Sequence, residues 1–462
     1  GIRRAPVLHA GHGELPVSRC ADGVGGQLKM AAIRSISFMW LASLFAAGFA
    51  LLSQMMIARS VQPNDYGLYA GSLTAAAILA PLAGLGVSGF LLRVFGEEGP
   101  AAQRWIKGCL TAMSYSMCAG ILACAAYTIS LSENSTGLVV GLALAPLILS
   151  FVGAEIAISR YQVEGNHLGV SLWTVVPNLL RVGVALAGWV MNWSIVGISV
   201  GIGVVSTVVG VWALATLLRA RWKDQPGPDA IRASTLDKVP VAQAAASAWP
   251  FGLSNFVFLV YFQSGVLMLA TLSSHTAAGV FSLGLSILTA VYLIPTVVAQ
   301  RYLMVKFHHW AAHHGPFFLK VFRTCCGVAL VSGLVMAVGV ALLAPYLVHV
   351  AFGAAYDEVG VILAMASLCI PARYLSCFIA AAYGTFGNMK PRLRTQIVLT
   401  VVMVPVSFLA IASHGLLGAT VAMVMGEWAM ALAYLYGCVR HIFGTDALHG
   451  WNLNIRALRG GR

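Results

Sequence analysis

Long stretches without a single charged residue alternate with short polar breaks along this chain. Every residue between Arg34 and Arg59 is uncharged, and the same holds for the intervals 66–92 and 108–132. Each stretch exceeds the roughly 20 apolar residues that a helix needs to cross the hydrocarbon core of a bilayer. Only 9% of the 462 residues are charged, against about 25% in a soluble domain. The sequence therefore predicts an all-α, multi-pass membrane protein.

Twelve spans account for these stretches when the longest ones are divided. The uncharged interval 182–218 is too long for one helix, and Asn192-Trp193-Ser194 supplies a turn within it. The interval 239–300 is divided in the same way near Ser273-Ser274-His275. The expected spans lie at about 35–57, 67–92, 108–130, 137–157, 168–190, 195–218, 250–271, 278–299, 322–344, 359–384, 395–413 and 415–439.

The basic residues lie almost entirely on one side of these spans. The two tails and the even-numbered loops hold 25 of the 28 Lys and Arg, whereas the odd-numbered loops hold only Arg59. Basic loops remain in the cytoplasm, so both termini are expected there. The net charge of +13 is thus explained by basic residues at the span ends, which contact anionic lipid headgroups and orient the spans during membrane insertion. No nucleic-acid partner is expected. The opposite loops are too short for an external catalytic domain.

The longest interior polar segment divides the spans into two sets of six. We expect an N-terminal tail at 1–32 that is disordered or non-native, a first lobe at 33–219, a Pro- and Gly-containing cytoplasmic linker at 220–245, a second lobe at 246–440 and a cytoplasmic tail at 441–462. Six spans per half give the repeats one orientation, related by a pseudo-twofold axis along the membrane normal. This layout is typical of transporters with a path between the lobes.

Two arginines and one glutamate are predicted deep inside spans. Arg181 and Arg373 lie near the middle of spans five and ten, where each costs about 2.5–3.5 kcal/mol on insertion scales. Each must therefore face a wet cavity or an anionic partner, and a phosphorylated ligand suits a guanidinium group. The alternative is a structural ion pair with Glu427 or Glu155. Glu427 in span twelve is accordingly interpreted as either an ion-coupling residue or a charge partner.

Proline and glycine mark five candidate hinges. Pro81, Pro177 and Pro371 fall inside predicted spans, where proline removes a backbone hydrogen bond and bends the helix. Gly84 and Gly86, near the end of span two, permit bending or close helix packing. The nine cysteines form no metal-type pattern, so neither a metal nor another cofactor is expected.

Short motifs in a characteristic order point to a known family. Pro63-Asn64-Asp65-Tyr66-Gly67-Leu68-Tyr69 resembles the G-P-E-D-Y-G-L-Y/F element of bacterial polysaccharide flippases, within the multidrug/oligosaccharidyl-lipid/polysaccharide exporter superfamily. The other matching segments are 250–255, 278–281, 352–356, 387–394 and 414–419, so the resemblance covers residues 33–440. The chain reads Gln263-Ser264-Gly265 where many members carry an R-x-D-like element, so no role carries over to that position.

The resemblance implies a twelve-helix flippase that performs no bond chemistry. Such proteins move an undecaprenyl-pyrophosphate-linked oligosaccharide across the bacterial cytoplasmic (inner) membrane by alternating access, and Arg181 and Arg373 would belong to a cationic cavity for it. The expected partners are this lipid-linked oligosaccharide, the bilayer and the polysaccharide polymerase machinery. Two alternatives stay open: a cation-coupled multidrug exporter of the same superfamily, and a membrane polysaccharide polymerase or ligase.

Overall fold

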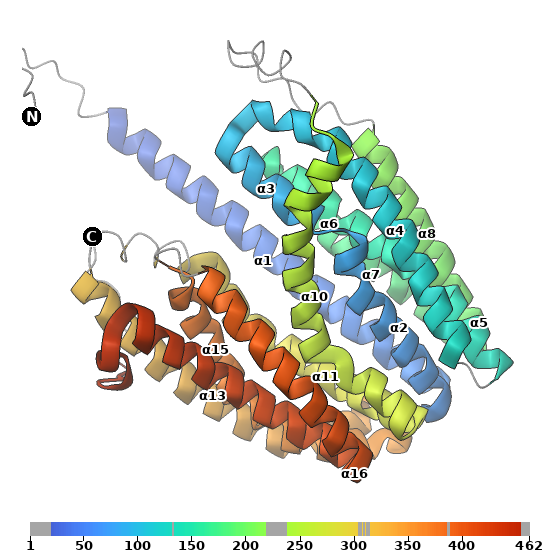
Figure 1. Cartoon of the computed structure of the whole chain (residues 1–462). Coiled ribbons are helices and arrows are strands. Elements are labelled where there is room, and N and C mark those ends of the chain that lie inside the picture. The colour runs from blue at the N-terminus through green and yellow to red at the C-terminus, as the bar shows by residue number, and fades with distance from the viewer. Residues whose placement is uncertain are drawn as a thin grey trace, which may run out of the picture.

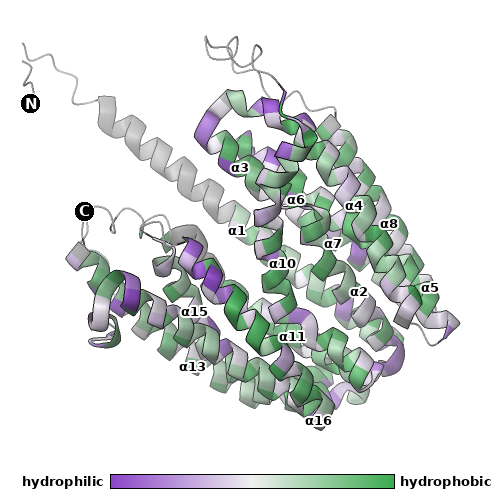
Figure 2. Cartoon of the chain, viewed as in Figure 1, coloured by the Kyte–Doolittle hydropathy of each residue, from purple (hydrophilic) through white to green (hydrophobic). Residues whose placement is uncertain are grey.

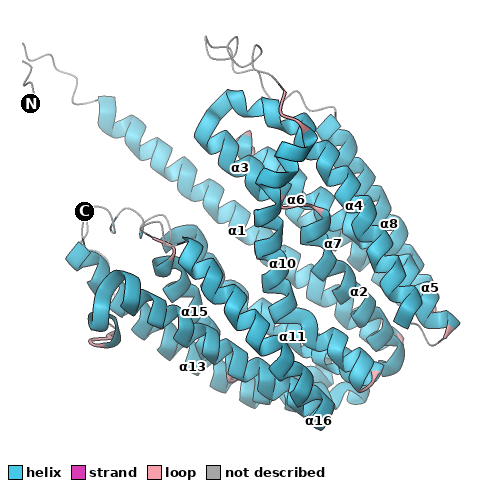
Figure 3. Ribbon diagram, in the orientation of Figure 1, coloured by secondary structure: helices cyan, strands magenta, loops and turns pink. Residues whose placement is uncertain are grey.

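The computed structural model describes residues 20–131, 134–218, 238–303, 307, 310, 315–385 and 389–453. Within these ranges every regular element is a helix, as Figure 3 shows. Ten helices in the described residues are long and apolar enough to cross a membrane, and one bent pair makes an eleventh span. The all-helical fold expected from the sequence is confirmed.

The first half of the chain forms six spans from eight α-helices. These are α1 (Cys20–Ser60), α2 (Pro63–Ala83), α3 (Val87–Glu98), α4 (Gln103–Leu131), α5 (Ser135–Leu144), α6 (Leu147–Val163), α7 (His167–Val190) and α8 (Ile195–Leu218). A 3₁₀ turn, η1 (Gly99–Ala102), joins α3 to α4.

The second half repeats this plan. Its α-helices are α10 (Val241–Leu272), α11 (His275–Val297), α13 (Gly315–Phe352), α14 (Asp357–Ala366), α15 (Cys369–Tyr383) and α16 (Met389–Cys438). Short π and 3₁₀ segments are η2 (Val298–Leu303), η3 (Ala354–Tyr356), η4 (Val439–Phe443) and η5 (Gly444–Leu448).

The helix α16 contains two spans. Its 50 residues would extend about 75 Å if straight, which far exceeds the roughly 30 Å bilayer core. Gly415 has non-helical backbone angles (φ 55°, ψ −127°) inside this helix, and Gly418 packs directly against the backbone of Ala410. The chain therefore folds back at Gly415, as the orange-to-red path in Figure 1 shows. Dividing α16 there brings the described spans to twelve, in agreement with the sequence.

The two lobes share an internal feature that supports their relationship as repeats. The fourth span of the first half consists of the ten-residue helix α5, a break, and the longer helix α6. The fourth span of the second half consists of the ten-residue helix α14, a break, and α15, with a bend of 51° between them. A matching interruption at equivalent positions is what a duplicated six-span unit predicts.

Polar residues in the loops begin several spans. The side chain of Asn134 accepts a hydrogen bond from the Gly137 amide at 2.7 Å, and Ser274 accepts one from the Ala277 amide at 3.1 Å. Such side chains satisfy amide groups that the first helical turn leaves unpaired. Between the ends, many large apolar side chains are exposed on the helices, and Figure 2 shows that the helices consist largely of hydrophobic residues. Contact with lipid requires such a surface.

The lobes meet at the end of the molecule where α1 and α10 end and α2 and α11 begin (Figure 1). Gly67 of α2 packs against the backbone of His275 at the start of α11. Gln54 of α1 accepts hydrogen bonds from the Tyr66 hydroxyl of α2 at 3.1 Å and from the Ser286 hydroxyl of α11 at 2.7 Å. A side chain of the first lobe thus holds the second lobe directly at this end.

Two predicted boundaries differ from the structure. The helix α1 begins at Cys20, so residues 20–32 are helical although the sequence suggested a tail up to residue 32. Residues 241–245 of the predicted linker already belong to α10, because the segment 241–249 contains neither Pro nor Gly. The linker residues 220–237 and the C-terminal residues 454–462 lie outside the described residues.

The predicted C-terminal tail is partly a packed structure. Phe443 packs against Phe318 of α13 with tilted rings whose centres are 4.9 Å apart. The Arg323 guanidinium donates to the backbone oxygen of Asp446 at 2.7 Å, and Ala447 is fully buried. Residues 441–453 therefore dock on α13, because their few apolar side chains find partners that are distant in sequence.

Candidate functional site

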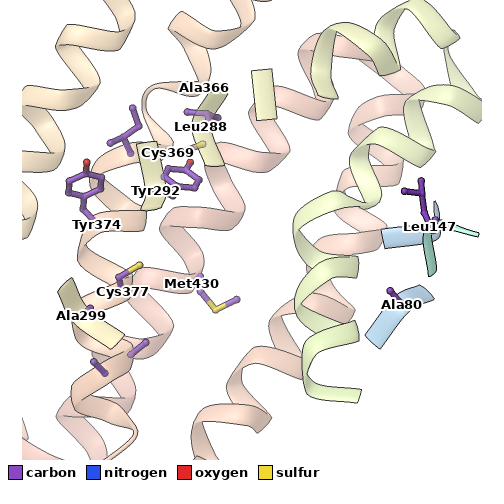
Figure 4. Close-up of a cluster of buried hydrophobic side chains, with 14 of the residues drawn as sticks. Ala80, Leu147, Leu288, Tyr292, Ala299, Ala366, Cys369, Tyr374, Cys377 and Met430 are labelled. Atoms are coloured by element: carbon purple, nitrogen blue, oxygen red, sulfur yellow. The ribbon is translucent and has the colours of Figure 1, made fainter. Parts of the chain in front are cut away.

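A cavity of about 550 Å³ lies within the second lobe. Its walls come from α10, α11, α15 and both spans of α16. The volume falls within the roughly 300–1,000 Å³ that small-molecule sites usually have. Its polar lining consists of hydroxyl, amide and guanidinium groups from Ser254, Asn255, Gln263, Thr289, Thr296, Ser376, Gln396, Arg373 and Arg392. Tyr292, Cys377 and Met430, which also line it, are seen among the buried side chains in Figure 4.

Arg373 reaches this cavity from α15 and forms an ion pair with Glu427 of α16. Its Nη1 lies 3.4 Å and 3.5 Å from the two carboxylate oxygens of Glu427. The Arg373 side chain is 14% exposed and that of Glu427 is 1% exposed. Of the two roles that the sequence left open for Glu427, charge pairing is the one that this geometry displays.

Aromatic rings enclose the same guanidinium group. The Arg373 guanidinium carbon lies 5.2 Å from the ring centres of Phe258 and Tyr292 and 5.3 Å from that of Phe262. The rings of Phe258 and Phe262 are nearly parallel, at 8°. A cation over aromatic faces is stabilised by their negative electrostatic potential. Glu427 and the three rings therefore fix Arg373 in place and offset its charge.

A second cation of the cavity escaped the sequence analysis. Arg392 lies in the first turn of α16, with its guanidinium carbon 5.9 Å from the ring centre of Tyr434. Among the described residues no Asp or Glu forms an ion pair with it. The sequence suggested only a cytoplasmic loop arginine here, because its position near a span end matches the general bias of basic residues. Gln396 follows Arg392 by one helical turn and lines the same cavity. This spacing of two polar residues could have indicated a polar face that points into the protein.

Arg181 lies in the other lobe and does not line this cavity. Its guanidinium carbon lies 4.8 Å from the ring centre of Phe151 on α6, and its buried Nε atom has no hydrogen-bond partner. No acid within the described ranges pairs with it. The structure therefore does not bring Arg181 and Arg373 into one pocket. Glu155, the other acid considered as an arginine partner, instead accepts a hydrogen bond from Ser88 at 3.5 Å.

The candidate hinges in span two coincide with an actual break. The helix α2 ends at Ala83, and Leu85 and Gly86 adopt positive φ values of 50° and 63° before α3 begins. Gly252 of α10 packs on this break, since a Cβ there would lie 2.8 Å from the Gly86 nitrogen and 2.7 Å from the Pro81 oxygen. The close approach explains why glycine is required at both Gly86 and Gly252.

The two remaining candidates differ from each other. Pro371 is the third residue of α15, directly after the 51° bend. Amide groups in the first turn of a helix have no acceptor within that helix, so the missing amide of proline costs no helical hydrogen bond there. Pro177 lies inside α7, which continues through it without interruption. Across the described residues, no group of three His, Cys, Asp or Glu side chains is arranged to hold a metal ion.

Comparisons with known proteins agree with this architecture. The fold is similar to "Lipid II flippase MurJ, inward closed conformation", with a TM-score of 0.67, 13% identity, and coverage of 91% of this chain and 90% of that chain. It is also similar to an inward-facing multidrug resistance MATE family transporter of the MOP superfamily, with a TM-score of 0.63, 14% identity, and coverage of 85% and 94%. A MOP superfamily transporter from Pyrococcus furiosus matches with a TM-score of 0.54, 13% identity, and coverage of 90% and 96%. At such identities the likeness establishes the fold alone.

The family is established by the sequence itself. No curated protein sequence matches the chain. Residues 32–303, however, match the model of the family described as "Polysaccharide biosynthesis protein", and this region is more than half of the 462 residues. The resemblance found in the short motifs is thereby confirmed, and the chain belongs to the polysaccharide biosynthesis protein family.

Proposed function

We propose that this protein moves a polyprenyl-pyrophosphate-linked oligosaccharide across the cytoplasmic membrane of a bacterium, for surface polysaccharide biosynthesis. The single observation that carries the proposal is the cavity in the second lobe, which combines guanidinium, amide, hydroxyl and aromatic groups. Guanidinium groups bind phosphate oxygens through paired hydrogen bonds, and amides and hydroxyls bind sugar hydroxyls. Membership of the polysaccharide biosynthesis family supports the same substrate class.

The arrangement of the lobes suits transport by alternating access. The lobes are held together where α2 and α11 begin, through Gln54, Tyr66 and Ser286. We assign the opposite end, where α4, α10 and α16 begin, to the cytoplasm, because Arg104, Lys107 and other basic residues gather there. Rocking of the lobes would then expose the substrate path to each side in turn. This step breaks and forms no covalent bond, and the proposal requires neither a metal nor another cofactor.

A cation-coupled multidrug exporter is disfavoured by the state of Glu427. A cationic drug needs an acid that is accessible from the cavity. The Glu427 side chain is 1% exposed and pairs with Arg373, so it offers little negative charge to an incoming cation. A polymerase or ligase is disfavoured by the short connections at the non-basic end, such as the two residues between α1 and α2, which leave no space for a catalytic domain there.

Transfer between leaflets can be measured in proteoliposomes. Purified protein is reconstituted with a fluorescent polyprenyl-pyrophosphate-linked oligosaccharide, and an impermeant glycosidase reports the fraction exposed outside. We expect the wild-type protein to accelerate exposure over protein-free liposomes. Arg181→Ala and Arg373→Ala should slow it, and the Lys variants should retain part of the rate.

Two results would contradict the proposal at different levels. Wild-type protein that moves the substrate no faster than empty liposomes would exclude flipping of this lipid. Full activity in both alanine variants would exclude a role for these two arginines while leaving the function in place. A polysaccharide polymerase on the outer face is a further expected partner, which copurification from the native membrane would test.

A further inference from the structure

The two arginines of the cavity differ in their available charge. Arg373 is paired with Glu427 and enclosed by three aromatic rings. Arg392 is half-buried, has no acid partner among the described residues and lines the same cavity. The unneutralised positive charge of the cavity is therefore at Arg392.

Their depths differ as well. Arg373 lies ten residues before Tyr383, where α15 ends near the basic end of the lobe, and this distance corresponds to about 15 Å along a helix axis. Arg392 lies in the first turn of α16 at that same end. One cation is thus at the mouth of the cavity on the basic side, and the other is well inside the membrane.

We propose that Arg392 holds the diphosphate of the substrate at the cavity mouth, and that the deep part around Arg373 receives uncharged sugar rings. This inference rests on the proposed function and names which group of the substrate each part contacts. A prenyl chain that stays in the lipid keeps its diphosphate near headgroup depth. The sugars attached beyond the diphosphate then extend into the cavity.

The surroundings of Arg392 fit a phosphate contact. The Arg392 guanidinium carbon lies 5.9 Å from the centre of the Tyr434 ring, and a side-chain hydrogen bond joins these two residues. A guanidinium group carries five N–H donors, so donors remain for a ligand in the cavity. A planar fork of this kind matches two phosphate oxygens. Gln396, one turn later on α16, lines the cavity beside it and supplies a further amide donor.

The surroundings of Arg373 fit a neutral sugar. The Phe258 and Phe262 rings present flat apolar faces that can cover the C–H face of a pyranose ring. Asn255 and Gln263 carry amide groups that can pair with sugar hydroxyls. Because Glu427 offsets the Arg373 charge, this part of the cavity gains little from a second anionic group. Glu427 would therefore restrict the diphosphate to the mouth.

The test uses inorganic pyrophosphate as the probe, measured by equilibrium dialysis on the full-length protein in nanodiscs. Arg392→Ala should weaken binding by about 10-fold or more, as the loss of a charge-assisted contact predicts. Arg394→Ala is the matched control, because Arg394 is exposed on the same helix and is not part of the cavity lining. It should change affinity by less than about 2-fold. Glu427→Gln should strengthen binding, because it frees the charge of Arg373.

Each outcome decides for or against the assignment. An equal loss in Arg392→Ala and Arg394→Ala would show attraction by general surface charge, and a larger loss in Arg373→Ala would make the deep arginine the anchor. Unchanged affinity in Glu427→Gln would overturn the neutralisation argument. Arg392→Gln and a thermal unfolding scan serve to detect misfolding of the alanine variant.

Failure of the assignment is distinguishable from failure of the proposed function. Wild-type protein that moves the lipid-linked oligosaccharide in proteoliposomes without Arg392-dependent pyrophosphate binding would refute only the assignment. Arg392-dependent binding without any transfer in proteoliposomes would refute the flippase and leave an anion site.

Discussion

Replacing Glu427 by leucine should destabilise the second lobe by about 3 kcal/mol. At the observed 3.4 Å between Arg373 Nη1 and the Glu427 oxygen, two unit charges attract by about 5 kcal/mol at an effective dielectric constant of 20, and desolvation of both groups offsets part of this. Removing one partner of a buried pair typically costs about 3–5 kcal/mol, because the other charge remains buried. The lower end applies here, since Arg373 also lines a cavity and contacts three rings.

A double-mutant cycle measures this coupling. Glu427→Leu, Arg373→Met and the double variant are compared by equilibrium unfolding of the purified protein in one detergent. The double variant should be within about 1 kcal/mol of the wild type, because two apolar side chains of similar volume replace a pair that was costly to desolvate. Arg373→Met should likewise cost about 3 kcal/mol, because it leaves the Glu427 carboxylate buried, so the coupling energy should be about 5–6 kcal/mol.

Additive single effects would refute this reasoning. A coupling energy below about 0.5 kcal/mol would mean that Arg373 and Glu427 interact mainly with other groups. The contact between Arg373 and Glu427 would then not neutralise the deep part of the cavity.

Three further changes test other contacts. Gly252→Ala should lower the unfolding temperature strongly, because the added Cβ would lie 2.8 Å from the Gly86 nitrogen, whereas Gly284→Ala, with nothing within 4 Å, should be tolerated; equal effects would contradict close packing at Gly252. Phe443→Ala should cost about 2–3 kcal/mol of unfolding free energy, less than a fully buried Phe, because the contact with the Phe318 ring is lost. An effect no larger than that of Phe45→Ala, at an exposed position, would argue against docking of residues 441–453. Gln54→Leu, which removes the acceptor for Tyr66 and Ser286, should speed amide exchange at the start of α2, and unchanged exchange would show that this contact does not hold the lobes.

The span pattern was predictable because it depends on local composition. Three local patterns in the sequence each correspond to a feature of the structure. They are the long uncharged stretches, the breaks that contain Asn and Ser, and the pair Gly84 and Gly86. Pro177 shows the limit of this approach, since a membrane helix can continue through proline without a break.

The site was only partly predictable because it depends on distant contacts. The pairing of Arg373 with Glu427 joins residues 54 positions apart, so the sequence could offer it only as one alternative. Arg392 was missed because an arginine near a span end has the same sequence signature whether it faces headgroups or a cavity. The docking of Phe443 on α13 was missed because isolated aromatic residues in a polar segment carry no periodic signal.

The helix α10 has a consequence for how the two halves remain associated. Just before its start, the Val239 amide donates to the Arg104 oxygen of the first half at 3.2 Å, and the Phe251 ring meets the Phe90 ring edge-on, with ring centres 6.1 Å apart. Its far end packs with α11 and α16, where Val266 and Leu269 are buried. The helix α10 is therefore one membrane-embedded element that contacts the first half near its start and the second half near its end. Any relative movement of the two halves must therefore bend α10 or break its contacts with one of them.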